Sequence, residues 1–214
     1  MIEIHVVFDT ICPWCFIGKR RLERALALRP DVKARFSWWP FLLNREMPLE
    51  GVDRTAYLIR KFGSEARVKR IYGSIVETGQ SVDIDFAFER IDRTPNSLDS
   101  HRLVMFAQRD GSANALVERL FINYFLYGRD IGAQDVLSDT AAEVGLDKAE
   151  VTAYLETPDD IEHIYNENTR AHRLGVNGVP AFVFNGGLVV TGAQEPKVLA
   201  RVLDAAIVNN GGGD

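Results

Sequence analysis

The stretch Asp9-Thr10-Ile11-Cys12-Pro13-Trp14-Cys15-Phe16-Ile17-Gly18 decides the fold of this chain and holds its only two cysteines. It follows residues 2–8, which alternate like a strand with one buried face. It also opens residues 13–29, whose helical spacing begins at a proline and stops before Pro30. A CxxC pair between a strand and a helix is typical of thiol–disulfide redox proteins.

The positions of the two cysteines suggest a chemical role for each. The free N–H groups and the dipole of the following helix favour negative charge at its start, which stabilises a thiolate on Cys12. Cys15 lies one turn further along and can attack a mixed disulfide on Cys12, which releases the substrate. We therefore interpret Cys12 as the nucleophile and Cys15 as the resolving thiol.

Two other interpretations of the cysteine pair stay open. A structural zinc site needs four ligands, but the chain has no second CxxC, and its histidines are scattered at positions 5, 101, 163 and 172. The cysteines could also be inert core thiols. The strand–helix junction favours redox chemistry over both, and we predict no metal site.

Composition excludes several classes of function. Apolar residues make up 46% of the chain, enough for a packed interior, and the net charge of -5 disfavours binding to nucleic-acid phosphates. No apolar run approaches the roughly 18 residues of a membrane span. Residues 1–5 lack the basic and apolar regions of a secretory signal, so we expect a cytoplasmic protein. Cytoplasmic thiols are kept reduced, and a cysteine pair there is more often catalytic than structural.

The rest of the chain supplies the other strands and many helices. Residues 32–39 alternate like a second strand, which gives a βαβ opening with parallel strands. Residues 53–174 carry helical punctuation, apart from a loop predicted over 80–95. The last helix of this block is predicted to begin at a Thr157-Pro158 cap and to run to Gly175.

The β signal then returns near the C-terminus. Residues 181–184 and 188–190 flank Asn185-Gly186-Gly187, a hairpin signature, and residues 195–208 form a last amphipathic helix. Without the helical block the order is βαβ–ββα, a thioredoxin fold of the α/β class. We predict a thioredoxin-like domain from residues 1–52 plus 175–210, an inserted α-helical domain from 53–174, and a flexible tail from 209–214.

Pro180 stands just before the third predicted strand. Proline cannot donate to a sheet ladder, so it marks a turn or an edge at this point. With a CxxC upstream in this fold, we predict that the Val179-Pro180 bond is cis. The Val179 backbone would then face an extended substrate segment beside Cys12. We expect Pro13, Trp14, Val179 and Pro180 to contact the substrate, with Trp14 exposed between the two sulfurs.

Several blocks of sequence resemble one family. CPWC after a strand, the segment GVNGVPAFVFNG and the helical insertion resemble the DsbA-like thiol–disulfide oxidoreductases. The finer resemblance is to the FrnE-like branch, through the blocks DTICPWCFIGKRRLE, WPFLLNREMP, YLIRKFG, TPNSLDSHRL and GVNGVPAFVFNGGLVVTGAQ. It spans the chain from about Ile4 to Leu203. It implies dithiol–disulfide exchange at Cys12 and Cys15, with Pro180 as the cis-proline.

A related branch leaves a second function open. The glutathione-dependent 2-hydroxychromene-2-carboxylate isomerases and kappa-class glutathione transferases carry serine where this chain has Cys12. The retained pair favours disulfide chemistry, while glutathione stays a candidate co-substrate. A metal-binding or redox-sensing module without catalysis is the third alternative. We expect protein or small-molecule thiols and disulfides as partners and no organic cofactor. Family analogy also suggests a homodimer, and the direction of electron flow is left open.

Three further residues are candidates for a supporting role. His101 lies on the apolar stripe of its predicted helix, where a core histidine is the default interpretation. If that helix faced Cys12, His101 could stabilise the thiolate or move a proton. The resemblance places the TPNSLDSHRL block, with Asn96 and His101, at that cleft. Asp9 could accept a proton near Cys15, although a helix-entry role is favoured.

Overall fold

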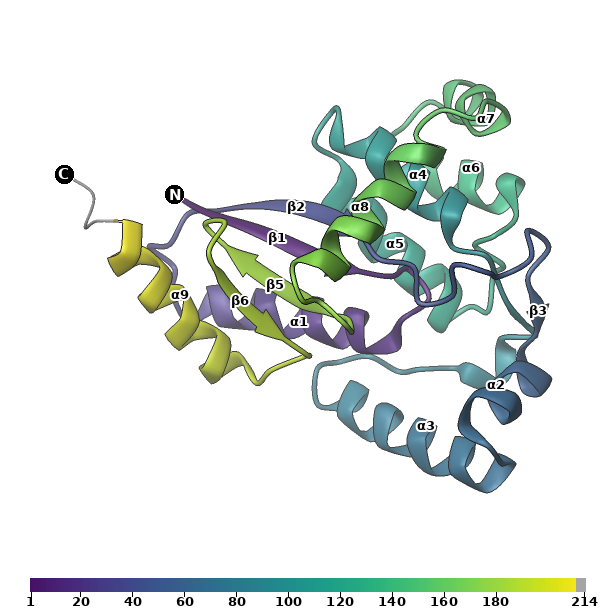
Figure 1. The fold of residues 1–214 in the computed structure, drawn as a ribbon, viewed down its shortest axis with the longest axis horizontal. Coiled ribbons are helices and arrows are strands. Elements are labelled where there is room, and N and C mark those ends of the chain that lie inside the picture. Colours follow the sequence, from purple (N-terminus) through teal and green to yellow (C-terminus); the bar gives the residue numbers. More distant parts are fainter. Residues whose placement is uncertain (211–214) are drawn as a thin grey trace.

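The computed structural model describes Met1–Asn210 and is built on a four-stranded sheet in the order β2-β1-β5-β6 (Figure 1). β1 (Ile2–Phe8) runs parallel to β2 (Ala34–Pro40), with Ile2 opposite Ala34. β5 (Ala181–Phe184) and β6 (Leu188–Thr191) are antiparallel to their neighbours, with Ile4 of β1 opposite Phe184. The central strands therefore come from opposite ends of the chain, as the βαβ–ββα pattern predicts.

Helices cover both faces of this sheet. α1 (Pro13–Ala27) and α9 (Pro196–Asn210) pack against each other, and the main core contains Ile4, Val6 and Phe8 of β1. Val7 points to the other face, where it joins a smaller apolar cluster with Ala171 of α8 (Ile161–Arg173). The alternation of β1 thus places successive side chains in two apolar clusters.

The inserted segment connects β2 to β5 and is mostly helical (Figure 1). Its elements are β3 (Val52–Asp53), α2 (Arg54–Phe62), α3 (Glu65–Gln80), the short 3₁₀ helix η1 (Phe88–Arg90), β4 (Arg93–Thr94), α4 (Leu98–Gln108), α5 (Ala113–Phe125), α6 (Gln134–Ala142), α7 (Lys148–Glu156) and α8. β3 and β4 pair antiparallel in a sheet of their own. Their two-residue length explains why no strand was predicted there.

The insertion and the thioredoxin-like part share one hydrophobic core. Phe16 of α1 stacks on Phe121 of α5 with ring centroids 5.1 Å apart, and Phe8 of β1 meets the edge of the same ring at 6.3 Å. Phe125, one turn further along α5, stacks on Phe16 at 6.4 Å. The predicted fold, a thioredoxin fold with a helical insertion, is confirmed.

Two boundaries differ from the prediction. α8 begins at Ile161 instead of following a Thr157-Pro158 cap. The reason is the buried Arg102, whose guanidinium donates hydrogen bonds to the carbonyls of Thr157 and Asp159 and holds that segment in a turn. α9 also continues through Asn210, so the predicted tail is helical at residues 209–210; its other residues, 211–214, lie outside the described part of the chain.

Candidate active site

Cys12 occupies the N-cap of α1, directly after the loop that leaves β1. Its backbone is extended, with φ -96° and ψ 111°, and its N–H donates to the Asp9 carbonyl at 3.1 Å. Pro13 takes the first helical position, where its missing N–H leaves no bond unmade. The Cys12 sulfur therefore sits at the positive end of the α1 dipole.

The loop before β5 lies against this sulfur. The Val179-Pro180 peptide bond is cis, as predicted. The Val179 carbonyl oxygen lies 3.7 Å from Cys12 Sγ, close enough to accept a hydrogen bond from the thiol. Gly18 of α1 allows this approach, because a Cβ at that position would come within 2.8 Å of Pro180 Cγ. The cis-proline loop and α1 thus meet at the cysteine pair.

Cys15 lies one turn further into α1 and is almost fully enclosed, with 1% of its surface exposed. Burial raises the pKa of the Cys15 thiol well above its ordinary value, and the adjacent Cys12 sulfur adds to the effect. Both cysteines are free. The two sulfurs therefore differ in their surroundings: Cys15 is enclosed within α1, whereas Cys12 stands at the helix N-terminus beside the cis-proline loop.

Asp9 is fully buried beneath the cysteine loop. Its carboxylate accepts the N–H of Leu43 at 2.8 Å and the N–H of Ile11 at 3.3 Å. His101 of α4 places Nε2 3.4 Å from Asp9 Oδ1, and neither ring nitrogen of this buried histidine has a hydrogen-bond partner. Asp9 and His101 are therefore brought together, and Asp9 ties the loop after β1 to the segment after β2.

A second buried link joins the cysteine loop to α4. Thr10 Oγ1 lies 2.7 Å from Ser100 Oγ, and the Ser100 hydroxyl also donates to the Ser97 carbonyl at 2.8 Å. Sequence reasoning identified neither Thr10 nor Ser100. Hydroxyls in a helical stretch give no periodic signal, so only the packing of α4 against the loop reveals this contact.

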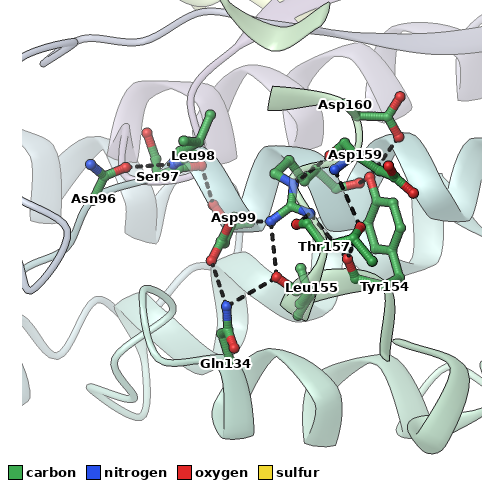
Figure 2. Close-up of polar contacts among 12 residues, drawn as sticks. Asn96, Ser97, Leu98, Asp99, Gln134, Tyr154, Leu155, Thr157, Asp159 and Asp160 are labelled. Carbon is green, nitrogen blue, oxygen red and sulfur yellow. Dashed lines mark hydrogen bonds and ion pairs between the residues drawn. The ribbon is translucent and has the colours of Figure 1, made fainter. Parts of the chain in front are cut away.

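Asn96 lies just before the N-terminus of α4, next to Ser97 and Leu98 (Figure 2). Its side-chain oxygen accepts the Leu98 N–H at 2.8 Å, and its nitrogen donates to the Met47 carbonyl at 2.7 Å. Both ends of the amide are used to fasten the start of α4 to the segment after β2. The geometry gives Asn96 a role in holding backbone segments together and puts it outside the walls of the cavity at Cys12.

A cavity of about 300 Å³ opens beside Cys12. One wall comes from the active-site loop and the cis-proline loop, and the other from α2, α3 and α5 of the insertion. Its lining comprises Ile11, Cys12, Pro13, Trp14, Leu43, Asn44, Arg54, Tyr57, Leu58, Lys61, Phe62, Ile71, Tyr72, Ile75, Thr94, Tyr124, Gly178 and Val179. Trp14 is half-buried in this wall rather than exposed between the sulfurs. The residues from the insertion were not predicted as site residues.

Two other findings concern the part of the chain that the structure describes. Across Met1–Asn210, none of the helices is both long enough and apolar enough to span a membrane. In the same residues, no group of three or more His, Cys, Asp or Glu side chains is arranged to hold a metal ion.

Comparison with known proteins places this geometry in a wider group. The family model described as a DSBA-like thioredoxin domain matches residues 3–204. The Bacillus subtilis protein YwbO is 26% identical over 209 residues, which cover 94% of this chain and 96% of that protein. A crystal structure of the probable DsbA oxidoreductase SCO1869 from Streptomyces coelicolor superposes with a TM-score of 0.89 at 26% identity, over 97% of this chain and 91% of the other.

A more distant structure extends the comparison to another activity. The structure of a 2-hydroxychromene-2-carboxylate isomerase has a TM-score of 0.72 over 98% of each chain, but only 14% of the residues are identical. A likeness at this identity concerns the fold alone. The finer resemblance to the FrnE-like branch stays a prediction.

Proposed function

Because this chain belongs to the DSBA-like thioredoxin domain family, we propose that it catalyses thiol–disulfide exchange through Cys12 and Cys15. One observation carries the proposal: Cys12 stands at the N-terminus of α1, 3.7 Å from the Val179 carbonyl of the cis-proline loop, with Cys15 buried one turn behind. A helix end, an accessible edge of backbone and a second thiol are the parts that disulfide exchange requires.

In the proposed reaction the Cys12 thiolate attacks one sulfur of a disulfide, and the other substrate sulfur leaves as a thiolate. The substrate is then held as a mixed disulfide on Cys12. Cys15 loses its proton and attacks Cys12 Sγ, which expels the second substrate thiolate and leaves the Cys12–Cys15 disulfide. Two electrons pass to the substrate; run in reverse, the same steps donate the disulfide.

The surroundings of the pair suit these steps. The α1 dipole stabilises the attacking thiolate, and the raised pKa of Cys15 keeps the resolving thiol protonated until the mixed disulfide forms. Asp9 lies beneath the loop, where its carboxyl group would accept the Cys15 proton, and His101 Nε2 lies 3.4 Å from Asp9 Oδ1. Val179-Pro180 would dock the substrate, together with Pro13 and Trp14 of the facing loop; Val179, Pro13 and Trp14 line the cavity, while Pro180 is buried.

The proposal includes the setting of the reaction. Electrons pass through the dithiol itself, so we propose that the reaction uses no metal or organic cofactor. The proposed partners are protein or small-molecule thiols and disulfides, with glutathione as one candidate co-substrate. A cytoplasmic location fits, because thiols are kept reduced there. We also propose that the protein forms a homodimer, by analogy with the family.

The test is the reduction potential of the cysteine pair, measured by equilibration in glutathione buffers and trapping of free thiols. A reversible two-electron couple supports the proposal. A potential near or above about -180 mV would indicate a disulfide donor or isomerase, and one below about -250 mV a reductase. In parallel, Cys12→Ser should abolish exchange, while Cys15→Ser should accumulate the mixed disulfide. The absence of any reversible couple would overturn the proposal.

The cavity beside Cys12 favours a second candidate function, a glutathione-dependent isomerase or transferase that acts on a small molecule. In that reaction Cys12 would position the glutathione sulfur and Cys15 would be dispensable. Full turnover by Cys15→Ser with glutathione and a small aromatic acid would favour this function over disulfide exchange, and loss of turnover would dismiss it.

A further inference from the structure

The wall of the cavity that faces Cys12 contains a buried guanidinium. Arg54 is the first residue of α2, and only 7% of its surface is exposed. Within Met1–Asn210 its side chain forms no ion pair with a carboxylate; Nη1 donates a hydrogen bond to the Tyr124 hydroxyl at 3.3 Å. Buried charges in proteins are normally paired, because an unpaired one is costly.

The groups around Arg54 hold it without neutralising it. The rings of Tyr72 and Phe88 flank the guanidinium, with centroids 5.1 and 5.5 Å from its central carbon. Burial raises the pKa of both the Tyr72 and the Tyr124 phenol, so both hydroxyls stay neutral near pH 7. The positive charge on the cavity wall therefore lacks a counter-charge from these neighbours.

Two further polar groups of the same cavity lack hydrogen-bond partners. Thr94 is 3% exposed and its hydroxyl oxygen is unpaired, and the side-chain nitrogen of Asn44 is also unpaired. Both groups can donate hydrogen bonds. A guanidinium and two spare donors in one cavity lining are groups that can bind a carboxylate.

Most of the remaining insertion wall is apolar, with the side chains of Leu58, Phe62, Ile71 and Ile75. Lys61, the other cation of the lining, is exposed and donates a hydrogen bond to the Tyr57 hydroxyl at 2.9 Å, so Arg54 is the buried cation of this wall. A ligand that fills this space therefore combines an apolar or aromatic body with an anionic group. We propose that the cavity binds a small organic disulfide or thiol that carries a carboxylate, with the carboxylate on Arg54 and the sulfur at Cys12. This inference rests on the proposed function, because it names the substrate class of the same dithiol.

The test compares two small disulfides in single-turnover reactions of the pre-reduced protein. Dithiobis(nitrobenzoate) carries a carboxylate on each aromatic half, and dithiodipyridine is neutral at pH 8. In both reactions the Cys12 thiolate attacks the disulfide, Cys15 resolves the mixed disulfide, and two coloured aromatic thiols or thiones leave while the protein is oxidised by two electrons. No other reductant is required.

The readout is the ratio of the rate constant for the acidic disulfide to that for the neutral one. Arg54→Met should lower this ratio about tenfold or more, since a hydrogen bond to a charged group is lost. Arg54→Lys should keep most of the preference. Arg60→Met is the matched control, because Arg60 is an exposed arginine of the same helix outside the cavity lining, and its ratio should stay unchanged.

Each outcome separates the two proposals. If Arg54→Met reacts with both disulfides at the wild-type ratio, the carboxylate site is wrong while disulfide exchange stands. If the wild-type protein releases no thiol from either disulfide, the proposed function itself fails. If Arg54→Met does not fold, the test uses inhibition of the wild-type protein's reaction with dithiodipyridine. Nitrobenzoate should inhibit this reaction more strongly than nitrobenzene does, and equal inhibition would contradict the carboxylate site.

Discussion

Replacing Gly18 by alanine tests whether close packing of α1 on the cis-proline loop holds the site together. An alanine Cβ would lie 2.8 Å from Pro180 Cγ and 3.2 Å from Phe182 Cζ. The first distance is about 0.6 Å short of the 3.4 Å at which ordinary contact begins. The obstructing atoms belong to a proline ring and a buried phenylalanine, so the loop itself must move.

The size of the effect follows from two opposing contributions. Alanine improves helix propensity by about 0.5–1 kcal/mol, and overpacking of a filled core costs about 1–3 kcal/mol. The matched control is Gly73→Ala in α3, where a Cβ meets nothing within 4 Å and only the propensity gain applies. Gly18→Ala should therefore be less stable than Gly73→Ala by about 1–3 kcal/mol.

The assay is urea unfolding of both reduced variants, followed by circular dichroism and fitted with a common m value. The rate of thiol release from a small disulfide is measured in parallel. Moving Pro180 also moves the Val179 carbonyl away from Cys12, so this rate should fall about tenfold in Gly18→Ala and stay unchanged in Gly73→Ala. Equal stabilisation by the two substitutions would refute the reasoning.

Three further predictions concern buried groups. The Cys15 thiol has a higher pKa in the folded protein than in the unfolded chain, so the protonated thiol stabilises the fold. This contribution to the free energy of unfolding is fully present below the unfolded thiol pKa of about 8.5 and is lost as pH rises toward the folded value. Reduced wild-type protein should therefore lose urea stability relative to Cys15→Ala above about pH 8.5, by up to about 1.4 kcal/mol per pH unit; parallel curves would contradict this. Arg102→Met should cost about 3–5 kcal/mol in the same assay, since it unpairs several buried carbonyls, whereas the exposed Arg201→Met should change stability by less than about 0.5 kcal/mol. His101→Phe should change it by less than about 1 kcal/mol, because neither ring nitrogen is hydrogen-bonded; a larger loss would identify the imidazole as a charged partner of Asp9.

The fold and the cysteine end of the site were predictable because their signals are local. Alternation in residues 2–8, the proline at the start of α1 and the Asn185-Gly186-Gly187 turn each act within a few residues. The cis bond at Pro180 was also predicted, from its place before a strand in a chain with CxxC. The first three features depend on backbone geometry that short sequences dictate, whereas the cis bond was predicted because the proline is paired with a distant CxxC.

The cavity wall was not predictable in the same way. Arg54 reads as an ordinary first-turn residue after the Asp53 cap, and its burial depends on α5 supplying Tyr124 from 70 positions away. The predicted start of α8 was wrong for a similar reason. Thr157 and Pro158 suit a helix cap, but Arg102, 55 positions before Thr157, donates hydrogen bonds to the carbonyls of this segment and holds it in a turn. Long-range polar contacts of this kind leave no periodic trace in sequence.

The placement of the two halves of the site in the chain has a consequence for biosynthesis. The Cys12–Val179 contact joins residues 167 positions apart. β1 can pair with β2 early in translation, but with β5 only near its end. At roughly 5–20 residues per second, the ribosome leaves the dithiol without its cis-proline loop for on the order of ten seconds. During that interval the nascent chain presents its cysteines to any oxidant, so a reducing environment protects the protein before it can act on a substrate.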